Sequence, residues 1–119
     1  MTLQRLKRYC FALDLSEDIE KIEVYKAYHK KVWPEINLGL RRAGIQHAEI
    51  YNTANRLFMI LEVDETFSLE RKAKMDAANP KVQQWEELMW KYQQALPHGQ
   101  EGSKWILMDK IYDLDEHSQ

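Results

Sequence analysis

Hydrophobic residues recur along this chain with two periods, one typical of strands and one typical of helices. The nearly continuous apolar run at residues 9–15 predicts a strand that is covered on both faces. Residues 45–51 alternate between apolar and polar, turn residues follow at 52–55, and residues 57–63 return as an apolar run, so we expect a β-hairpin. A last strand is expected within residues 104–113.

Helical spacing begins after the first strand. Ser16 is a candidate N-cap, and apolar residues then recur every three or four positions on a face that includes Tyr25 and His29. Pro34 interrupts this helix and suits the first turn of a second helical piece, which is expected to end at Ala43-Gly44.

Two more helices are expected over residues 67–78 and 80–95, which are divided by an Asn-Pro step. We also expect a loop over residues 97–103 and a flexible tail at about 115–119. The resulting order, β-α-β-β-α-β, predicts a ferredoxin-like α+β fold in a single domain spanning residues 1–119.

The predicted strands carry hydrophobic residues on both faces. Residues 58–61 and 105–108 are apolar at successive positions, whereas a ferredoxin-like sheet has helices on one face and is usually polar on the other. A chain of 119 residues has no spare element to cover the second face. We therefore expect a homodimer, a dimeric α+β barrel in which two sheets pack face to face.

Composition narrows the function classes. The chain is 45% hydrophobic and 30% charged, and its 17 basic and 19 acidic residues are interspersed, so neither a membrane span nor a nucleic-acid surface is expected. The four histidines lack ligand-like spacing and no Gly-rich phosphate loop is present, so we expect no metal and no cofactor. The single cysteine, Cys10, and the lack of a signal-peptide pattern favour a cytoplasmic location.

Tyr25 and His29 are the first candidates for chemistry. They are four residues apart, so a helix places them on one face, and imidazole titrates near neutrality, which suits proton transfer. The spacing alone favours the plainer interpretation, a buried histidine satisfied by a backbone carbonyl beside a tyrosine that belongs to the core.

Aromatic residues give a second signal, with four tryptophans and six tyrosines. An indole ring stacks on the apolar face of a sugar ring, and Glu86 directly after Trp85 offers a carboxylate to sugar hydroxyls. The alternative is that these rings fill a small core and that Glu86 belongs to a solvated helix face.

The chain resembles the L-rhamnose mutarotase family from about residue 8 to residue 114, through a string and two shorter pieces in the same order: Tyr25-x3-His29-x3-Trp33-Pro34-Glu35, Ile50-Tyr51 and Gln84-Trp85. The resemblance implies a dimeric α+β barrel that interconverts the α and β anomers of a 6-deoxyhexose without a cofactor. It also implies that His29 is the proton-donating catalytic residue, that Tyr25 contacts the substrate, and that Trp85 is the first of two tryptophans at the sugar.

Two sugar-contacting positions depart from the rhamnose enzymes, which have a second tryptophan in place of Glu86 and a tyrosine in place of Ala48. Residues 88–93, with Lys104-Trp105, look more like family members associated with L-fucose. The resemblance therefore implies a monosaccharide substrate, either L-fucose or L-rhamnose. His47 and Glu86 are further candidates for substrate binding and for the complementary base.

Two alternatives come from other classes. Small cofactor-free monooxygenases and haem-degrading enzymes share this fold, and a sugar-binding or dimerisation module would have no chemistry at all. A haem site needs a histidine on a wide apolar cleft, whereas the helix with His29 carries lysines at positions 26, 30 and 31. Anomer exchange in the presence of the protein distinguishes a mutarotase from all of these.

Overall fold

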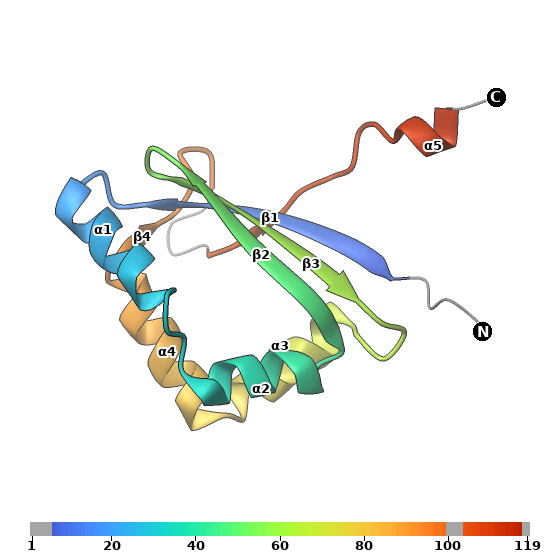
Figure 1. Ribbon diagram of the computed structural model, residues 1–119, viewed down its shortest axis with the longest axis horizontal. Helices are drawn as coiled ribbons and strands as arrows, with labels where there is room; N and C mark the ends of the chain where they lie inside the picture. Colours follow the sequence, from blue (N-terminus) through green and yellow to red (C-terminus); the bar gives the residue numbers. More distant parts are fainter. Residues whose placement is uncertain (1–5, 100–103, 118–119) are drawn as a thin grey trace.

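The computed structural model describes residues 6–99 and 104–117, and it has two layers. An antiparallel sheet forms the upper layer, and four helices lie beneath one of its faces (Figure 1). In chain order the elements are β1 (Lys7–Leu15), α1 (Ile19–Tyr28), α2 (Pro34–Arg42), β2 (Ile45–Thr53), β3 (Arg56–Val63), α3 (Leu69–Ala77), α4 (Pro80–Trp90), β4 (Gln93–Gln94), β5 (Ile106–Leu107) and α5 (Leu114–His117).

The sheet has the strand order β2-β3-β1-β4, with β5 also paired to β1, and its long strands are antiparallel. The predicted hairpin is therefore confirmed, and with it the ferredoxin-like α+β class. A bulge between Ile45 and His47 shifts the register of β2, so that Ala48 and Ile50 lie on the same face as Met59 and Leu61 of β3. We call this face, which points toward the helices, the inner face of the sheet.

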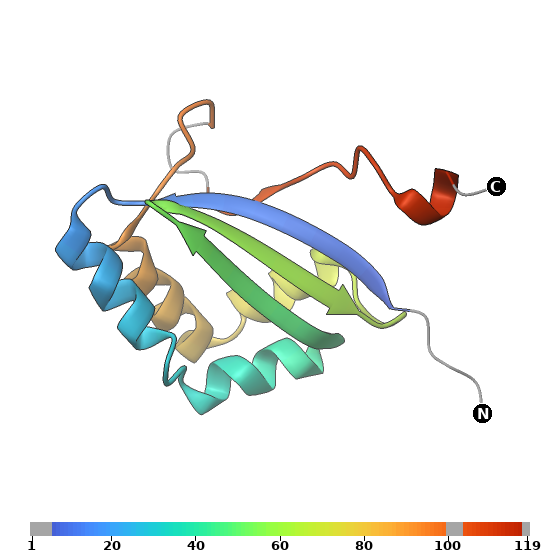
Figure 2. The same cartoon turned by 45° about the horizontal axis from the view of Figure 1, so that its top comes forward.

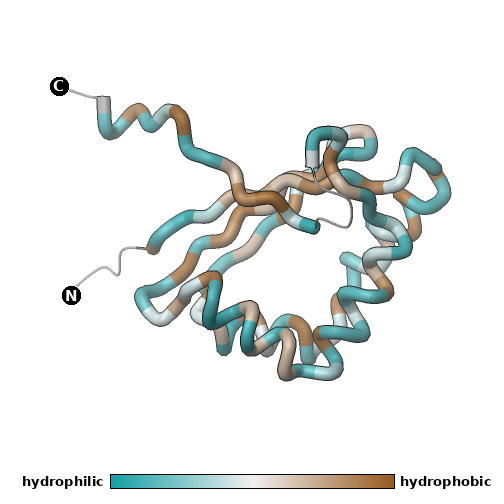
Figure 3. The backbone as a smooth tube through the Cα atoms, turned by 180° about the vertical axis from the view of Figure 1, so that it is seen from behind, coloured by the Kyte–Doolittle hydropathy of each residue, from teal (hydrophilic) through white to brown (hydrophobic). Residues whose placement is uncertain are grey.

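The inner face of the sheet carries the core. Leu13, Leu15, Leu57 and Val63 are each at most 2% exposed, and they alternate along their strands with residues that point the other way. Two hydrophobic clusters form beneath them, one against α1 and α4 and the other against α2 and α3. Figure 3 shows that hydrophobic positions recur along the strands of the sheet.

Side chains at the helix starts satisfy the free backbone amides. Asp18, rather than Ser16 as predicted, is the N-cap of α1, because its carboxylate accepts a hydrogen bond from the Glu20 amide at 2.9 Å. The Ser16 hydroxyl instead accepts from the Asp18 amide, which makes a turn before the helix. Asn79 caps α4 in the same way, with Pro80 in the first turn as expected.

The C-terminal third of the chain departs most from the prediction. α4 ends at Trp90 rather than at residue 95, because the backbone turns there and Gln93 and Gln94 pair with β1. The last strand is only two residues long, and the chain then leaves the sheet and ends in α5 (Figure 2).

Two predicted segments overlap residues that the structure does not describe. Residues 97–99 of the expected loop are described and residues 100–103 are not. Residues 115–117 of the expected tail belong to α5, and residues 118–119 lie outside the described part, so the flexible tail stays a prediction. In the described ranges, no helix has the length and apolar character needed to cross a bilayer.

Candidate functional site

A cavity of about 410 Å³ lies between the inner face of the sheet and the helices, a volume typical of sites for small molecules. Its wall is apolar over much of its area, where residues such as Ile36, Leu61 and Val82 face it. The polar and titratable residues on the wall come from five helices and strands and the segment before β5: Tyr25, His29, Asn37, Lys72, Asp76, Glu86, Gln93 and Lys104.

His29 stands at the C-cap of α1, one turn after Tyr25, and both residues line the cavity. Their rings are 4.4 Å apart between centroids. The Nδ1 atom of His29 is 2.9 Å from the backbone oxygen of Tyr25. A carbonyl can only accept, so Nδ1 carries the hydrogen and the neutral ring has its lone pair on Nε2.

Burial sets the protonation state of this pair. Burial lowers the pKa of His29 below its ordinary value of 6.5, and the bond to the Tyr25 carbonyl offsets this only in part. Burial also raises the pKa of Tyr25 to about 12, with a smaller opposing effect from Gln93. Near pH 7 the site therefore holds a neutral imidazole, which can accept a proton, beside a phenol that keeps its own.

Gln93 fixes the hydroxyl of Tyr25. Its side-chain amide donates to the Tyr25 oxygen at 3.3 Å, from the segment that pairs with β1. The phenol oxygen accepts this bond, so the phenol hydrogen is left to donate to another group. Tyr25 is thereby oriented as a hydrogen-bond donor in the cavity.

Trp85 projects from α4 beside His29, with 5.6 Å between the ring centroids and an angle of 67° between the planes. Trp33 packs edge-on against Trp85 at 5.1 Å, and Tyr28 does so at 6.3 Å. The aromatic residues of the predicted motif thus form one cluster, in which Tyr25, His29 and Trp85 line the cavity and Trp33 packs behind them against the core.

The charged residues on the cavity wall form two ion pairs. Glu86 lies 3.7 Å from Lys104, measured from Oε2 to Nζ, and Lys72 is paired with Asp76 one turn further along α3. Each pair has no net charge, so the cavity wall of the described residues is electrically balanced when His29 is neutral. Such a wall suits an uncharged, hydroxyl-rich ligand better than a phosphate or a carboxylate.

His47 does not line this cavity. The bulge in β2 turns its side chain to the opposite face of the sheet, where it lies 3.4 Å from Glu49 and is about half exposed. The structure brings together the other four predicted site residues, namely Tyr25, His29, Trp85 and Glu86. No observation in this cavity supports the prediction that His47 contacts the sugar.

Five polar residues of the wall were not predicted as site residues from the sequence, namely Asn37, Lys72, Asp76, Gln93 and Lys104. The sequence pattern predicts a helix through residue 95, and such a pattern does not predict that Gln93 pairs with β1. Lys72 and Asp76 have the same spacing as the neighbouring pair Glu70 and Lys74, and nothing in the sequence says which of the two pairs turns inward. Within the described residues, no group of three or more His, Cys, Asp or Glu side chains is arranged to hold a metal ion.

Comparison with known proteins gives a consistent result. The family model described as L-rhamnose mutarotase matches residues 8–114. An L-fucose mutarotase of Xanthomonas campestris pv. campestris is 41% identical over 118 residues, which cover 98% of this chain and 92% of the relative.

Solved structures show the same fold. The crystal structure of L-rhamnose mutarotase FA22100 from Formosa agariphila aligns with a TM-score of 0.67 and 22% identity, covering 90% of this chain and 97% of that one. A dimeric ferredoxin-like protein from an uncultured marine organism aligns with a TM-score of 0.53 and 14% identity, covering 92% and 95%. At these identities the likeness establishes the fold alone.

Proposed function

The chain belongs to the L-rhamnose mutarotase family of sugar isomerases, and we propose that it interconverts the α and β anomers of a 6-deoxy-L-hexose by acid–base ring opening without a cofactor. The observation that carries the proposal is the pairing of a neutral imidazole with a phenol donor at one cavity. Mutarotation needs just these two functions, because one oxygen of the sugar loses a proton while another gains one.

In the proposed mechanism, Nε2 of His29 takes the proton from the anomeric hydroxyl as the bond between C1 and the ring oxygen breaks. Tyr25 donates its hydrogen to the departing ring oxygen, and Gln93 holds the phenol in the orientation for this. The product is the open-chain aldehyde. Rotation about the C1–C2 bond and return of both protons close the ring on the other face.

The remaining cavity groups are proposed to hold the sugar. Trp85 offers its ring as a stacking surface, and Glu86, beside Lys104, accepts hydrogen bonds from a hydroxyl. The name of the 41% identical relative favours L-fucose over L-rhamnose as the preferred substrate. L-Fucose and L-rhamnose differ in the orientation of the C2 and C4 hydroxyls. A carboxylate at position 86, where the rhamnose enzymes have tryptophan, could distinguish the two sugars by accepting a hydrogen bond from one of these hydroxyls.

A homodimer is part of the proposal. The sheet face opposite the helices, which we call the outer face, carries apolar residues from neighbouring strands, namely Cys10, Ala12, Phe58, Ile60 and Ile106. None of the helices α1 to α4 covers this face (Figure 1). A second copy of the sheet is the simplest cover.

The proposed location is the cytoplasm, where monosaccharide catabolism takes place and thiols stay reduced. Cys10 is a free thiol in β1, which is compatible with that compartment.

The deciding experiment is exchange NMR on L-fucose and L-rhamnose with the purified protein. We expect faster exchange between the two anomeric signals, and we expect His29→Asn to slow it by at least about 100-fold, the usual contribution of a general base. His98→Asn is the matched control, because His98 is an exposed loop residue away from the cavity wall. A module that binds sugar without chemistry would give saturation transfer and no exchange, and a haem-degrading enzyme would instead shift the Soret band of added haemin.

A further inference from the structure

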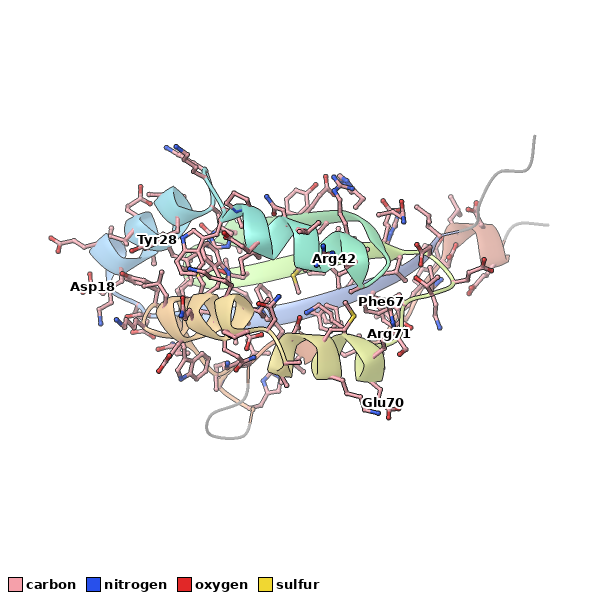
Figure 4. The ribbon with its side chains drawn as sticks, turned by 90° about the horizontal axis from the view of Figure 1, so that it is seen from below. Asp18, Tyr28, Arg42, Phe67, Glu70 and Arg71 are labelled. Carbon is pink, nitrogen blue, oxygen red and sulfur yellow. The ribbon has the colours of Figure 1, made fainter. Side chains whose placement is uncertain are left out.

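The ion pair between Lys72 and Asp76 is placed unlike the other pair on its helix. Both pairs on α3 have the i, i+4 spacing, but the side chains of Lys74 and Glu70 are 77% and 81% exposed, whereas those of Lys72 and Asp76 are 26% and 19% exposed. Figure 4 shows Glu70 pointing away from the other helices. Lys72 and Asp76 instead line the cavity.

The pair lies in a different part of the cavity from the acid–base residues. Lys72 and Asp76 come from α3, which lies beneath one end of the sheet with α2, whereas His29 and Tyr25 come from α1, which lies beneath the other end with α4 (Figure 4). Apolar residues such as Ile36 and Val82 line the wall of the same cavity. The Lys72–Asp76 pair thus comes from a different helix than the acid–base residues and than Glu86 of the other ion pair, and it has no part in the proposed proton transfers.

Little of the hydrogen-bonding capacity of this pair is taken up by side chains of the described residues. Among the hydrogen bonds of the described residues, the ammonium of Lys72 and the carboxylate of Asp76 have only each other as side-chain partners. An ammonium has three hydrogens to donate and a carboxylate can accept about four bonds. A partly buried ion pair gives little net stability, since loss of hydration offsets the attraction between the charges. The pair is thus suited to a ligand that both donates and accepts, without charge of its own.

We propose that Lys72 and Asp76 form a hydroxyl-binding subsite that reads the orientation of two adjacent ring hydroxyls remote from C1. Asp76 accepts from one hydroxyl, and Lys72 donates to the oxygen of the next. This inference rests on the proposed function, since it takes the ligand to be a monosaccharide whose C1 lies at His29. Adjacent hydroxyls on a pyranose ring offer a donor and an acceptor side by side, which an ion pair with charge-assisted bonds can match.

The test measures how the removal of single sugar hydroxyls affects the wild type and variants of Lys72 and Asp76. Wild-type protein is assayed by exchange NMR and by saturation-transfer binding on L-fucose, L-rhamnose and their 2-, 3- and 4-deoxy analogues. We expect one or two analogues to lose about 10- to 100-fold in kcat/KM or in affinity, the range for a hydrogen bond to a charged group. Asp76→Asn and Lys72→Met should each lose a similar factor on the parent sugar and lose nothing further on the analogue that lacks the hydroxyl bound by the substituted residue.

The matched controls are Glu70→Gln and Lys74→Met, which alter the exposed pair of the same helix and should behave as wild type on every sugar. Thermal unfolding identifies a variant that does not fold, and either variant of the inner pair decides the question, because each should cancel the deoxy effect of the hydroxyl that its own residue binds. Variants that match the wild type, or that weaken all sugars and analogues by one common factor, overturn the subsite.

The outcomes for the subsite and for the proposed function are distinguishable. If the wild type accelerates exchange and the variants of Lys72 and Asp76 show no hydroxyl-specific loss, the subsite alone is wrong. If the wild type binds sugars without exchange, the proposed function is wrong and the affinities still decide the subsite. If it neither binds nor exchanges any of these sugars, both are wrong.

Discussion

Three side chains determine the direction in which protons move in the cavity. The backbone oxygen of Tyr25 fixes the hydrogen of His29 on Nδ1, so Nε2 is the basic atom. The amide of Gln93 occupies a lone pair of the phenol oxygen, so the phenol donates. A base and a donor one helical turn apart are therefore defined by two hydrogen bonds, without a charged group in contact with either ring.

The shifted pKa of His29 predicts the pH profile of anomer exchange. Because burial lowers the pKa of His29 below 6.5, the neutral base persists to pH values below that, and protonation then removes it. The pKa of about 12 for Tyr25 keeps the phenol donor intact through the alkaline side. We expect kcat/KM to be flat from about pH 7 to 9 and to fall on the acid side, with a midpoint below 6.5.

Exchange NMR across a series of buffers checks this profile on L-fucose. The residual rate of His29→Asn should lack the acid limb, whereas His98→Asn should keep it. A midpoint above 6.5 would show that a different group, or a hydrated imidazole, controls the reaction.

At this scale the sequence was informative where helical spacing decides geometry. The four-residue interval between Tyr25 and His29 sufficed to predict that the two rings share a face, and they do. The bulge at the start of β2 could not be predicted from the sequence pattern. Because one extra residue turns every following side chain to the other face, the bulge places His47 on the outer face. The inward turn of Lys72 depends on how α3 packs, which a repeating charge pattern does not reveal.

At the scale of elements, the junction between α2 and β2 holds one end of the cavity in place. The helix ends at Ala43, and Gly44 then adopts a φ of +98°, a left-handed conformation that suits glycine. Arg71, on α3, donates to the backbone oxygens of Arg42, Ala43 and Thr66, which ties the end of α2 to α3. Figure 4 shows Arg71 and Arg42 at this junction.

Substitution of the two glycines of this region should have opposite effects on stability. A Cβ on Gly44 would lie 2.6 Å from side-chain oxygens of both Asp64 and Thr66, and its φ is strained for any L-residue. We expect Gly44→Ala to lower the free energy of unfolding by about 2 kcal/mol or more. Gly39 lies within α2, and a Cβ there would meet its nearest neighbour, Val82, at 3.8 Å. Gly39→Ala should therefore raise the free energy of unfolding by about 0.5–1 kcal/mol.

Thermal and urea unfolding followed by circular dichroism measures both variants against the wild type. Equal changes in the two variants, in either direction, would contradict the role given to the positive φ at Gly44.

The elements that the sequence predicted well are those with long local patterns. The hairpin and the helices carry their own periodicity and caps, so β2, β3 and α3 were predicted to within a few residues. β4 and β5 are two residues long each and pair with β1. The strand expected within residues 104–113 does form, as β5. Its short length and the existence of β4 depend on pairing with β1, which is a tertiary event that no local pattern encodes.

At the scale of the whole molecule, one protomer has more surface than its size requires. It exposes 9,015 Å², whereas a compact monomer of 14.3 kDa exposes about 6,800 Å². Its radius of gyration is 15.6 Å, against about 13.5 Å for a compact chain of this length. The C-terminal segment contributes to this excess, because Ile111, Tyr112 and Leu114 are 95%, 62% and 66% exposed.

The proposed dimer predicts that a charge on the outer face separates the two copies. Ile60 lies on β3 between Cys10 of β1 and Glu49 of β2, on the face opposite the cavity. We expect wild type to sediment as a dimer at micromolar concentration and Ile60→Arg to sediment as a folded monomer, because burial between the two sheets would cost the arginine its hydration, which a single neighbouring carboxylate, Glu49, offsets only in part. Leu38→Arg is the matched control, since Leu38 is half exposed on α2, in the helical layer, and its substitution should leave the dimer intact. Wild type that sediments as a monomer would show that the apolar outer face has some other occupant, and a dimeric Ile60→Arg would place the contact elsewhere.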